Sequence, residues 1–174
     1  EAALVIGADG RNSIIRKAAG LEVQSFGIAT DILWMKISKK AGDPQQAMGH
    51  AGPSQGLVLI DRGVYWQCGY VITKGTVDSL KEQGLEALRA RIADVAPLSA
   101  DRFEEIRSWD DIHLLSVRID RLKSWWKPGV LCIGDAAHAM SPIGGVGVNL
   151  AIQDAIATAN TLAEALREGR LQTR

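Results

Sequence analysis

Residues 129–155 read GVLCIGDAAHAMSPIGGVGVNLAIQDA, and this segment gives the strongest indication of the fold. It begins with an apolar run that is typical of a buried strand, and a long apolar helix is expected to follow over about residues 148–166. A loop that only joins a strand to a helix needs about two or three turn residues. The segment between them instead contains a proline and the glycines Gly134, Gly144, Gly145 and Gly147. We therefore expect a ligand to lie against this backbone.

Asp135 follows directly after the expected strand over residues 130–133 and the turn at Gly134. In α/β sheets, ligands bind beyond the carboxyl ends of the strands, which is where this carboxylate would project. A carboxylate accepts hydrogen bonds from hydroxyl groups such as those of a sugar or a ribityl chain. The alternative role is a cap of the turn or of a helix, because Asp is also common there.

The glycines at 144, 145 and 147 remove side chains in front of the expected helix. The first amide N–H groups of a helix have no partner within it, and that end carries a partial positive charge that suits an anion or an electron-rich oxygen. Because the helix is apolar on nearly all sides, we expect it to be buried. A buried helix start without side-chain caps requires another partner for its amides, and a ligand is the natural candidate.

The start of the chain shows the same order of strand, glycine turn and helix. Residues 2–6 are expected to form a short buried strand, followed by the turn GADG at 7–10 and a helix over about residues 13–19 that ends at Gly20. This order is half of a nucleotide-binding α/β unit. The chain opens on this apolar run without Met or a polar lead-in, so we expect a fragment of a longer protein.

From Phe26 onward the pattern is mostly that of strands. Residues 31–40 and 114–120 are expected to be strands, residues 57–60 and 64–73 to pair as a β-hairpin, and residues 77–95 to form one helix. The sequence thus predicts three segments: residues 1–25 and 109–174 belong to one α/β domain, and residues 26–108 form a β-rich domain inserted into it.

The composition indicates a globular protein with no net charge. Of the 174 residues 47% are hydrophobic, and 20 Lys and Arg balance 20 Asp and Glu, so no net field attracts nucleic acid or anionic lipid. No apolar stretch reaches the roughly twenty residues of a transmembrane helix. The two cysteines, Cys68 and Cys132, lie in apolar strand-like sequence without a CxxC partner, which favours a reducing, cytoplasmic location.

Other motifs are weaker. Residues 52–56 match the G-x-S-x-G pattern around Ser54, but a nucleophile elbow needs a strand before the serine and a helix after it, and the expected order here is loop and then strand. The three histidines stand far apart and away from other ligand residues, so no metal site is expected. No Gly-Lys-Ser/Thr sequence follows the glycine run, which argues against a P-loop.

The two glycine turns resemble the DG and GD motifs of the flavin-dependent monooxygenases with the para-hydroxybenzoate hydroxylase fold, a family that also includes halogenases and geranylgeranyl reductases. The first match is ALVIGADGRNSIIRKAAG at 3–20, and the second is residues 131–155. The resemblance implies an α/β fold in which part of an FAD/NAD(P)-binding Rossmann-like domain carries an inserted, mostly β substrate-binding domain. The motif residues of the first match are Asp9, Gly10, Ser13 and Arg16.

The resemblance also implies how FAD is held. Asp135 would bind the ribityl chain, the loop through Pro142 would pass beside the isoalloxazine ring, and backbone amides of residues 145–149 would face the pyrimidine edge. Asp9 would serve the FAD pyrophosphate and NAD(P)H. No catalytic residue is assigned. The implied cofactor-binding residues are Asp9, Gly10, Arg16, Gly134, Asp135, Pro142, Gly144, Gly145, Val146, Gly147, Val148 and Asn149.

By the same resemblance, NADH or NADPH reduces the flavin, oxygen adds to it, and a flavin hydroperoxide hydroxylates a small organic substrate, aromatic ones included. Two alternatives stay open: a flavin-dependent reductase of the geranylgeranyl-reductase type, and a non-catalytic remnant domain. The family's amino-terminal G-x-G-x-x-G and its acidic ribose ligand are absent from the sequence, so we expect the chain alone to purify without FAD.

Four aromatic residues alternate along the expected strands of the inserted domain. They either line the substrate pocket or serve as ordinary packing: Trp34, Tyr65, Trp66 and Tyr70.

Overall fold

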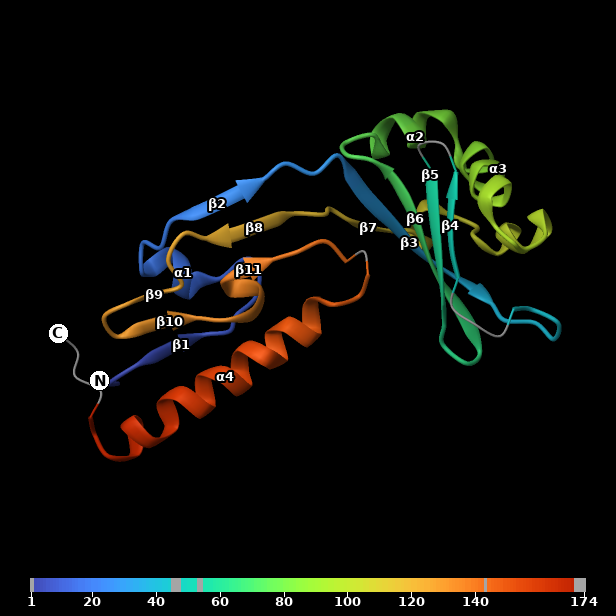
Figure 1. Ribbon diagram of the computed structural model, residues 1–174. Helices are drawn as coiled ribbons and strands as arrows, with labels where there is room; N and C mark the ends of the chain where they lie inside the picture. Colours follow the sequence, from blue (N-terminus) through green and yellow to red (C-terminus); the bar gives the residue numbers. More distant parts are fainter. Residues whose placement is uncertain (1, 45–47, 53–54, 143, 171–174) are drawn as a thin grey trace. The chain divides into compact units, whose positions relative to one another are not determined.

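The computed structural model describes residues 2–44, 48–52, 55–142 and 144–170 and confirms the expected α/β class. The chain divides into two compact units (Figure 1). The first, here called the two-segment unit, comprises Glu1–Ile28 and Val117–Arg174, and the second, the inserted unit, comprises Ala29–Ser116. The chain therefore changes units three residues after the expected boundary at residue 25 and eight after the one at residue 108.

One sheet of the two-segment unit contains a parallel pair of strands. Strand β1 (Val5–Gly7) pairs in parallel with β10 (Val130–Cys132), and β10 pairs antiparallel with β9 (Trp126–Lys127). Figure 1 shows β1 and β10 side by side although they come from opposite ends of the chain. Because parallel strands end at the same edge of a sheet, the glycine turns at residues 8–10 and 133–135 leave the sheet next to each other.

A second, antiparallel sheet of this unit has the order β11 (His138–Ala139), β8 (Ile119–Leu122), β2 (Val23–Phe26). The prediction of a single strand over residues 114–120 is wrong, because β7 (His113–Leu115) and β8 are separate strands. Residues 116–118 belong to no strand, and the residues before and after this break pair in different sheets, because the change of unit falls there.

Two helices follow the glycine turns. Helix α1 (Ile14–Ala18) confirms the helix expected over 13–19, and Ser13 caps it by accepting a 2.9 Å hydrogen bond from the amide of Arg16. The second turn contains the short 3₁₀ helix η3 (Gly134–Ala136), and helix α4 (Gly147–Arg167) follows the second group of glycines.

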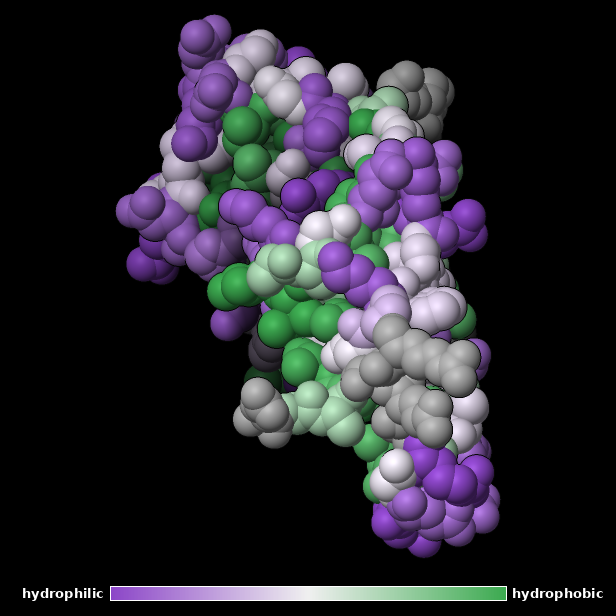
Figure 2. Space-filling view, turned by 90° about the vertical axis from the view of Figure 1, so that its left-hand side faces the viewer, coloured by the Kyte–Doolittle hydropathy of each residue, from purple (hydrophilic) through white to green (hydrophobic). Residues whose placement is uncertain are grey.

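The expected burial of α4 is wrong for this chain. None of its described residues is buried, and Ile152 and Ile156 are 52% and 55% exposed. The physical reason is that the described residues pack mainly against one side of the helix, where it contacts η3. Apolar side chains also reach the surface on the face of the molecule drawn in Figure 2.

The inserted unit is built on one antiparallel sheet of order β4-β5-β6-β3-β7. The expected hairpin is confirmed as β5 and β6, which pair from Gly56 opposite Val71 to Asp61 opposite Trp66. Ser54 of the G-x-S-x-G match lies outside the described residues. The strands of this sheet are β4 (Met48–Gly52), β5 (Gln55–Asp61), β6 (Tyr65–Thr73), β3 (Thr30–Ser38) and β7 (His113–Leu115).

The helix expected over residues 77–95 is wrong as a single element. It consists of α2 (Val77–Gln83) and α3 (Leu85–Val95), separated by Gly84 at φ +91°. Two short 3₁₀ helices, η1 (Ala100–Glu105) and η2 (Trp109–Asp111), follow. Apolar residues from these elements and from one face of the sheet make the main core, which includes Leu33, Ile37, Leu59, Trp66, Leu88, Ile92 and Phe103.

Candidate functional site

A cavity of about 550 Å³ lies in the two-segment unit, where the glycine turns meet the start of α4. Both chain segments contribute to its wall, so the two motifs recognised separately in the sequence form one site. Of the residues predicted to bind a cofactor, the cavity is lined by Gly10, Gly134, Asp135, Pro142, Gly145, Gly147 and Val148. The other described lining residues are Ala8, Arg11, Ile133, Met140, Ser141, Ala151 and Ala155.

Gly134 brings the second turn close to α4. Its φ is +57°, a left-handed conformation that favours glycine, and a Cβ there would lie 3.1 Å from the Cβ of Ala151 on α4. A larger residue would therefore be strained in its backbone and crowded against the helix. Gly10 and Gly145 also have positive φ, of +81° and +65°, but a Cβ at either would meet open space.

The start of α4 carries no side-chain cap, as the sequence predicted. Its N-cap residue is Val146, which makes no capping hydrogen bond through its side chain, and the first turn contains no acidic residue. The positive end of the helix dipole is therefore not compensated by its own side chains. Gly147 and Val148 of this first turn line the cavity, whereas Gly144, Val146 and Asn149 do not.

Asp135 opens on the cavity from η3, and its nearest charged partner is Arg11. The Asp135 Oδ2 atom lies 3.2 Å from Nη2 of Arg11, and the two side chains are 34% and 32% exposed. A pair this exposed contributes at most about 1 kcal/mol, so Asp135 keeps lone pairs and solvent access for a ligand. Sequence reasoning missed Arg11, although its position directly after the Asp9–Gly10 turn was a usable signal.

Asp9 performs the capping role that the sequence left open for Asp135. Its Oδ2 atom accepts hydrogen bonds from the amides of Ile14 at 2.7 Å and Ile15 at 3.2 Å. The hydrogen bond with the Ser13 side chain, together with these amides, holds the pKa of the Asp9 carboxyl below its usual value. Asp9 is not among the residues that line the cavity.

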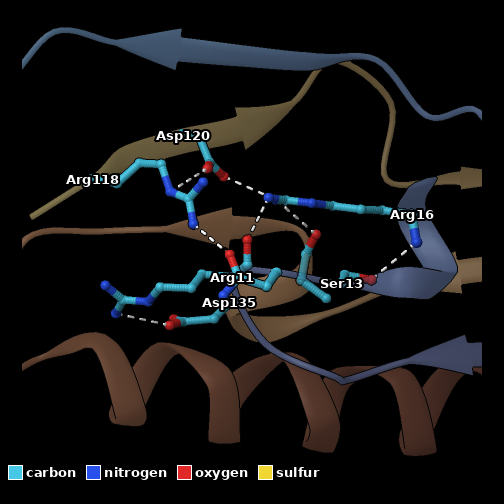
Figure 3. Close-up of polar contacts among 8 residues, drawn as sticks. Arg11, Ser13, Arg16, Arg118, Asp120 and Asp135 are labelled. Carbon is cyan, nitrogen blue, oxygen red and sulfur yellow. Dashed lines mark hydrogen bonds and ion pairs between the residues drawn. The ribbon is translucent and has the colours of Figure 1, made fainter. Parts of the chain in front are cut away.

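Arg16 also lies away from the cavity wall, in a buried polar cluster (Figure 3). Its Nη1 atom is 2.9 Å from Oδ1 of Asp120 on β8. The neighbouring Arg118 approaches the other oxygen of Asp120 at 3.7 Å and donates to the Asn12 side chain at 2.6 Å. The structure thus assigns Arg16 protein partners.

A second polar group behind the turn was also missed. The Oδ2 atom of Asp154 on α4 accepts a 2.8 Å hydrogen bond from the backbone amide of Gly134. The same oxygen lies 2.6 Å from Nε2 of His138. The His138 ring lies 4.9 Å from that of Trp125. Asp154 therefore ties the turn to α4. The spacing of His138 and Asp154 could not reveal this, because only the fold brings them together.

The inserted unit separates the four aromatic residues that the sequence grouped. Trp66 and Tyr70 are buried in the main core, at 0% and 3% exposure, and serve packing. Trp34 and Tyr65 instead line a cavity of about 390 Å³ that also contains Gln67 and His113. The Trp34 ring packs close to Gly69 of the neighbouring strand β6, since a Cβ on Gly69 would lie 2.8 Å from that ring.

Within the described ranges, no cluster of three or more His, Cys, Asp or Glu side chains is arranged to hold a metal ion. Over those same residues, none of the helices has the length and apolar character needed to cross a membrane.

The sequence matches the family described as "FAD binding domain" over residues 1–173. A 6-methylpretetramide 4-monooxygenase of Streptomyces rimosus is 36% identical over 172 residues, which is 98% of this chain and 41% of the relative. A digeranylgeranylglycerophospholipid reductase 2 of Methanothermobacter thermautotrophicus is 30% identical over 181 residues, which is 100% of this chain and 44% of the relative. The chain thus spans less than half the length of either relative.

Solved structures share the fold. The structure described as pqsL, a probable FAD-dependent monooxygenase from Pseudomonas aeruginosa, superimposes with a TM-score of 0.79 at 23% identity. The likeness covers 96% of this chain and 47% of that one.

Proposed function

Since this chain belongs to the FAD binding domain family, we propose that the complete protein is an FAD-dependent monooxygenase. NADH or NADPH would be its electron donor, and it would transfer one oxygen atom of O₂ to a small organic substrate. The relative named as a monooxygenase supports this reading. The resemblance noted in the sequence is confirmed at the level of the family. The cytoplasmic location stays a prediction.

The residues of the cavity fit FAD. One observation carries the proposal: Asp135 and the uncapped start of α4 open on the same glycine-lined cavity. A ribityl chain needs hydrogen-bond acceptors, and a flat ring system needs backbone that it can approach closely. The ring also gains from a positive potential at the edge where negative charge collects. The cavity provides each of these features.

In this proposal the residues of the cavity bind different parts of FAD. Asp135 accepts hydrogen bonds from ribityl hydroxyls, residues 140–142 flank the ring, and the first amides of α4 face its pyrimidine edge. Bound FAD would supply the two-electron chemistry and the reaction with oxygen. Arg11 and Asp135 are the ionisable side chains of the described cavity wall, and their mutual pairing suits binding and orientation. Asp9 stays a predicted contact of the pyrophosphate and of NAD(P)H.

The proposal is tested by titrating the complete apoprotein with FAD, as wild type and as Asp135→Ala and Asp135→Asn. Losing a hydrogen bond to a charged group costs about 1.5 to 3 kcal/mol, so Asp135→Ala should raise the dissociation constant roughly tenfold to a hundredfold. Asp135→Asn keeps one acceptor oxygen and should lose less. Glu22→Ala, which removes a 69% exposed carboxylate from the same unit, is the matched control. Unchanged affinity of a folded Asp135→Ala protein would contradict the assignment.

A reductase that uses the same cofactor is the second candidate, favoured by the relative named as a digeranylgeranylglycerophospholipid reductase. The same cavity would serve both, so the reaction of the reduced protein with oxygen distinguishes them. A non-catalytic remnant would show no FAD binding in the titration.

A further inference from the structure

Arg16 connects the two glycine turns that build the cavity. From helix α1, its Nη2 atom donates to the carbonyl of Arg11 at 2.5 Å, and its Nη1 atom lies 3.4 Å from the carbonyl oxygen of Ala136. Arg11 and Asp135 form the ion pair at the cavity wall, and Ala136 is the residue after Asp135. One guanidinium thus holds the backbone on both sides of that pair.

Asp120 fixes the guanidinium in place. Its carboxylate is 2.9 Å from Nη1 of Arg16, and the side chains of Arg16 and Asp120 are 9% and 2% exposed. Asp120 stands in β8, the middle strand of its sheet, opposite Ser25 on one side and Ala139 on the other. Figure 3 shows Arg16 extended from α1 toward Asp120, with Asp135 and the Arg11 side chain beyond it.

This environment does not suit a ligand contact for Arg16. An arginine that recognises a phosphate presents its planar fork to the ligand. The fork of Arg16 instead meets a buried carboxylate and two protein carbonyls, and its charge is already neutralised. Burial of a single unpaired charge would be costly, which explains why Asp120 accompanies it.

We propose that Arg16 and Asp120 are positioning residues that hold the Arg11 turn and the Asp135 turn together, so that both present to the cofactor. The identity of that cofactor rests on the proposed function. Arg16 then affects FAD binding through the two turns, without touching FAD or NAD(P)H itself.

The test compares FAD dissociation constants and unfolding midpoints of the complete protein for Arg16→Lys and for the double variant Arg16→Met with Asp120→Leu. Replacing a buried ion pair by apolar residues of similar volume often preserves stability, so the double variant separates folding from positioning. It should fold with a midpoint near that of the wild type and bind FAD roughly tenfold or more weakly. Arg16→Lys keeps the positive charge and can still donate a hydrogen bond to one of the turns. It should therefore bind FAD more tightly than the double variant and more weakly than the wild type.

Ionic strength separates positioning from direct phosphate contact. If Arg16 acts through the turns, the ratio of variant to wild-type dissociation constants stays the same at low and high salt. Lys123→Ala, which breaks an exposed ion pair with Glu22, is the control and should bind FAD like the wild type.

Wild-type FAD affinity in Arg16→Lys, or in a folded double variant, would overturn the inference. An intact FAD affinity with a raised KM for NAD(P)H would also overturn it, and would make Arg16 a nicotinamide-nucleotide ligand. Failure of the wild type itself to bind FAD would instead contradict the proposed function.

Discussion

Asp9 and Asp135 follow the two strands of one parallel pair, yet their carboxylates have different partners. Asp9 accepts hydrogen bonds from two backbone amides of α1. Asp135 instead forms an ion pair with the partly exposed Arg11 at the cavity wall. The difference follows from what comes next in the chain: a capped helix begins five residues after Asp9, while η3 already contains Asp135. The residue type alone therefore allowed both roles, and local geometry decided between them.

Asp43 gives the inserted unit a pH-dependent contribution to stability. Its carboxylate accepts hydrogen bonds from Arg102 at 2.8 and 3.0 Å and from the Trp66 indole at 2.9 Å. The Arg102 hydrogen bonds, followed by those from the Lys40 amide and Trp66, hold the pKa of Asp43 well below its usual range. Because the folded pKa lies below the unfolded value, the stabilisation is complete above the unfolded pKa and is lost as pH falls toward the folded one.

We therefore predict that Asp43→Asn lowers the free energy of unfolding at neutral pH by about 3 kcal/mol, because Arg102 keeps a buried charge without its partner. The variant should also lose less stability than the wild type as pH drops from about 4 toward 2. Urea unfolding across this pH range measures both effects. Glu82→Gln, an exposed change on α2, is the control. A parallel pH dependence in Asp43→Asn and wild type would show that Asp43 does not carry this contribution.

Gly145, just before α4, tests the role of the helix start. Its φ is +65°, and a Cβ there would point into open space next to the cavity. Gly145→Val should strain the backbone by about 1 to 2 kcal/mol and place a branched side chain where the ring is proposed to meet the helix amides. We expect weaker FAD binding and slower reduction by NAD(P)H in the complete protein.

Gly129→Val is a matched control for this change. Gly129 has φ +80°, a Cβ there also meets open space, and the residue does not line the cavity. Both variants should therefore lose similar stability in a thermal unfolding measurement, and only Gly145→Val should lose FAD affinity. Equal FAD affinity in the two variants would place the ring away from the start of α4.

The elements next to the motifs were predictable, because short-range signals define them. Ser13 and Gly20 bound α1, and the glycines around residue 145 precede α4. The errors fell where the determining interaction is distant. Leucine spacing continues through residues 77–95, so the break at Gly84 was hidden, and the change of unit within residues 114–120 depends on pairing with other strands.

The site was predicted as a set of motifs but not as a network. The glycines and Asp135 were found because their residue types match what a cofactor needs. Asp120 and Asp154 were not, since each acts through a partner at least sixteen residues away, and Arg11 was missed although it directly follows the Asp9–Gly10 turn. Alternating aromatic residues likewise could not show that Trp66 faces the core while Trp34 lines a cavity.

Each unit of the molecule has its own core and its own cavities. Several large apolar residues of α4, such as Val148, Ile152 and Ile156, are exposed in the described chain, and exposed apolar surface of this kind commonly marks a contact with another part of a protein or a partner. The function proposed for the site therefore has to be measured on the complete protein.

The reaction of the reduced complete protein with oxygen tests the proposed monooxygenase activity most directly. The protein is reduced with NAD(P)H, mixed rapidly with oxygenated buffer, and followed by flavin absorbance. A monooxygenase should reoxidise rapidly and release hydrogen peroxide when its substrate is absent. Slow reoxidation by oxygen, together with stoichiometric reduction of an alkene acceptor under anaerobic conditions, would contradict the proposed monooxygenase activity and establish the reductase instead.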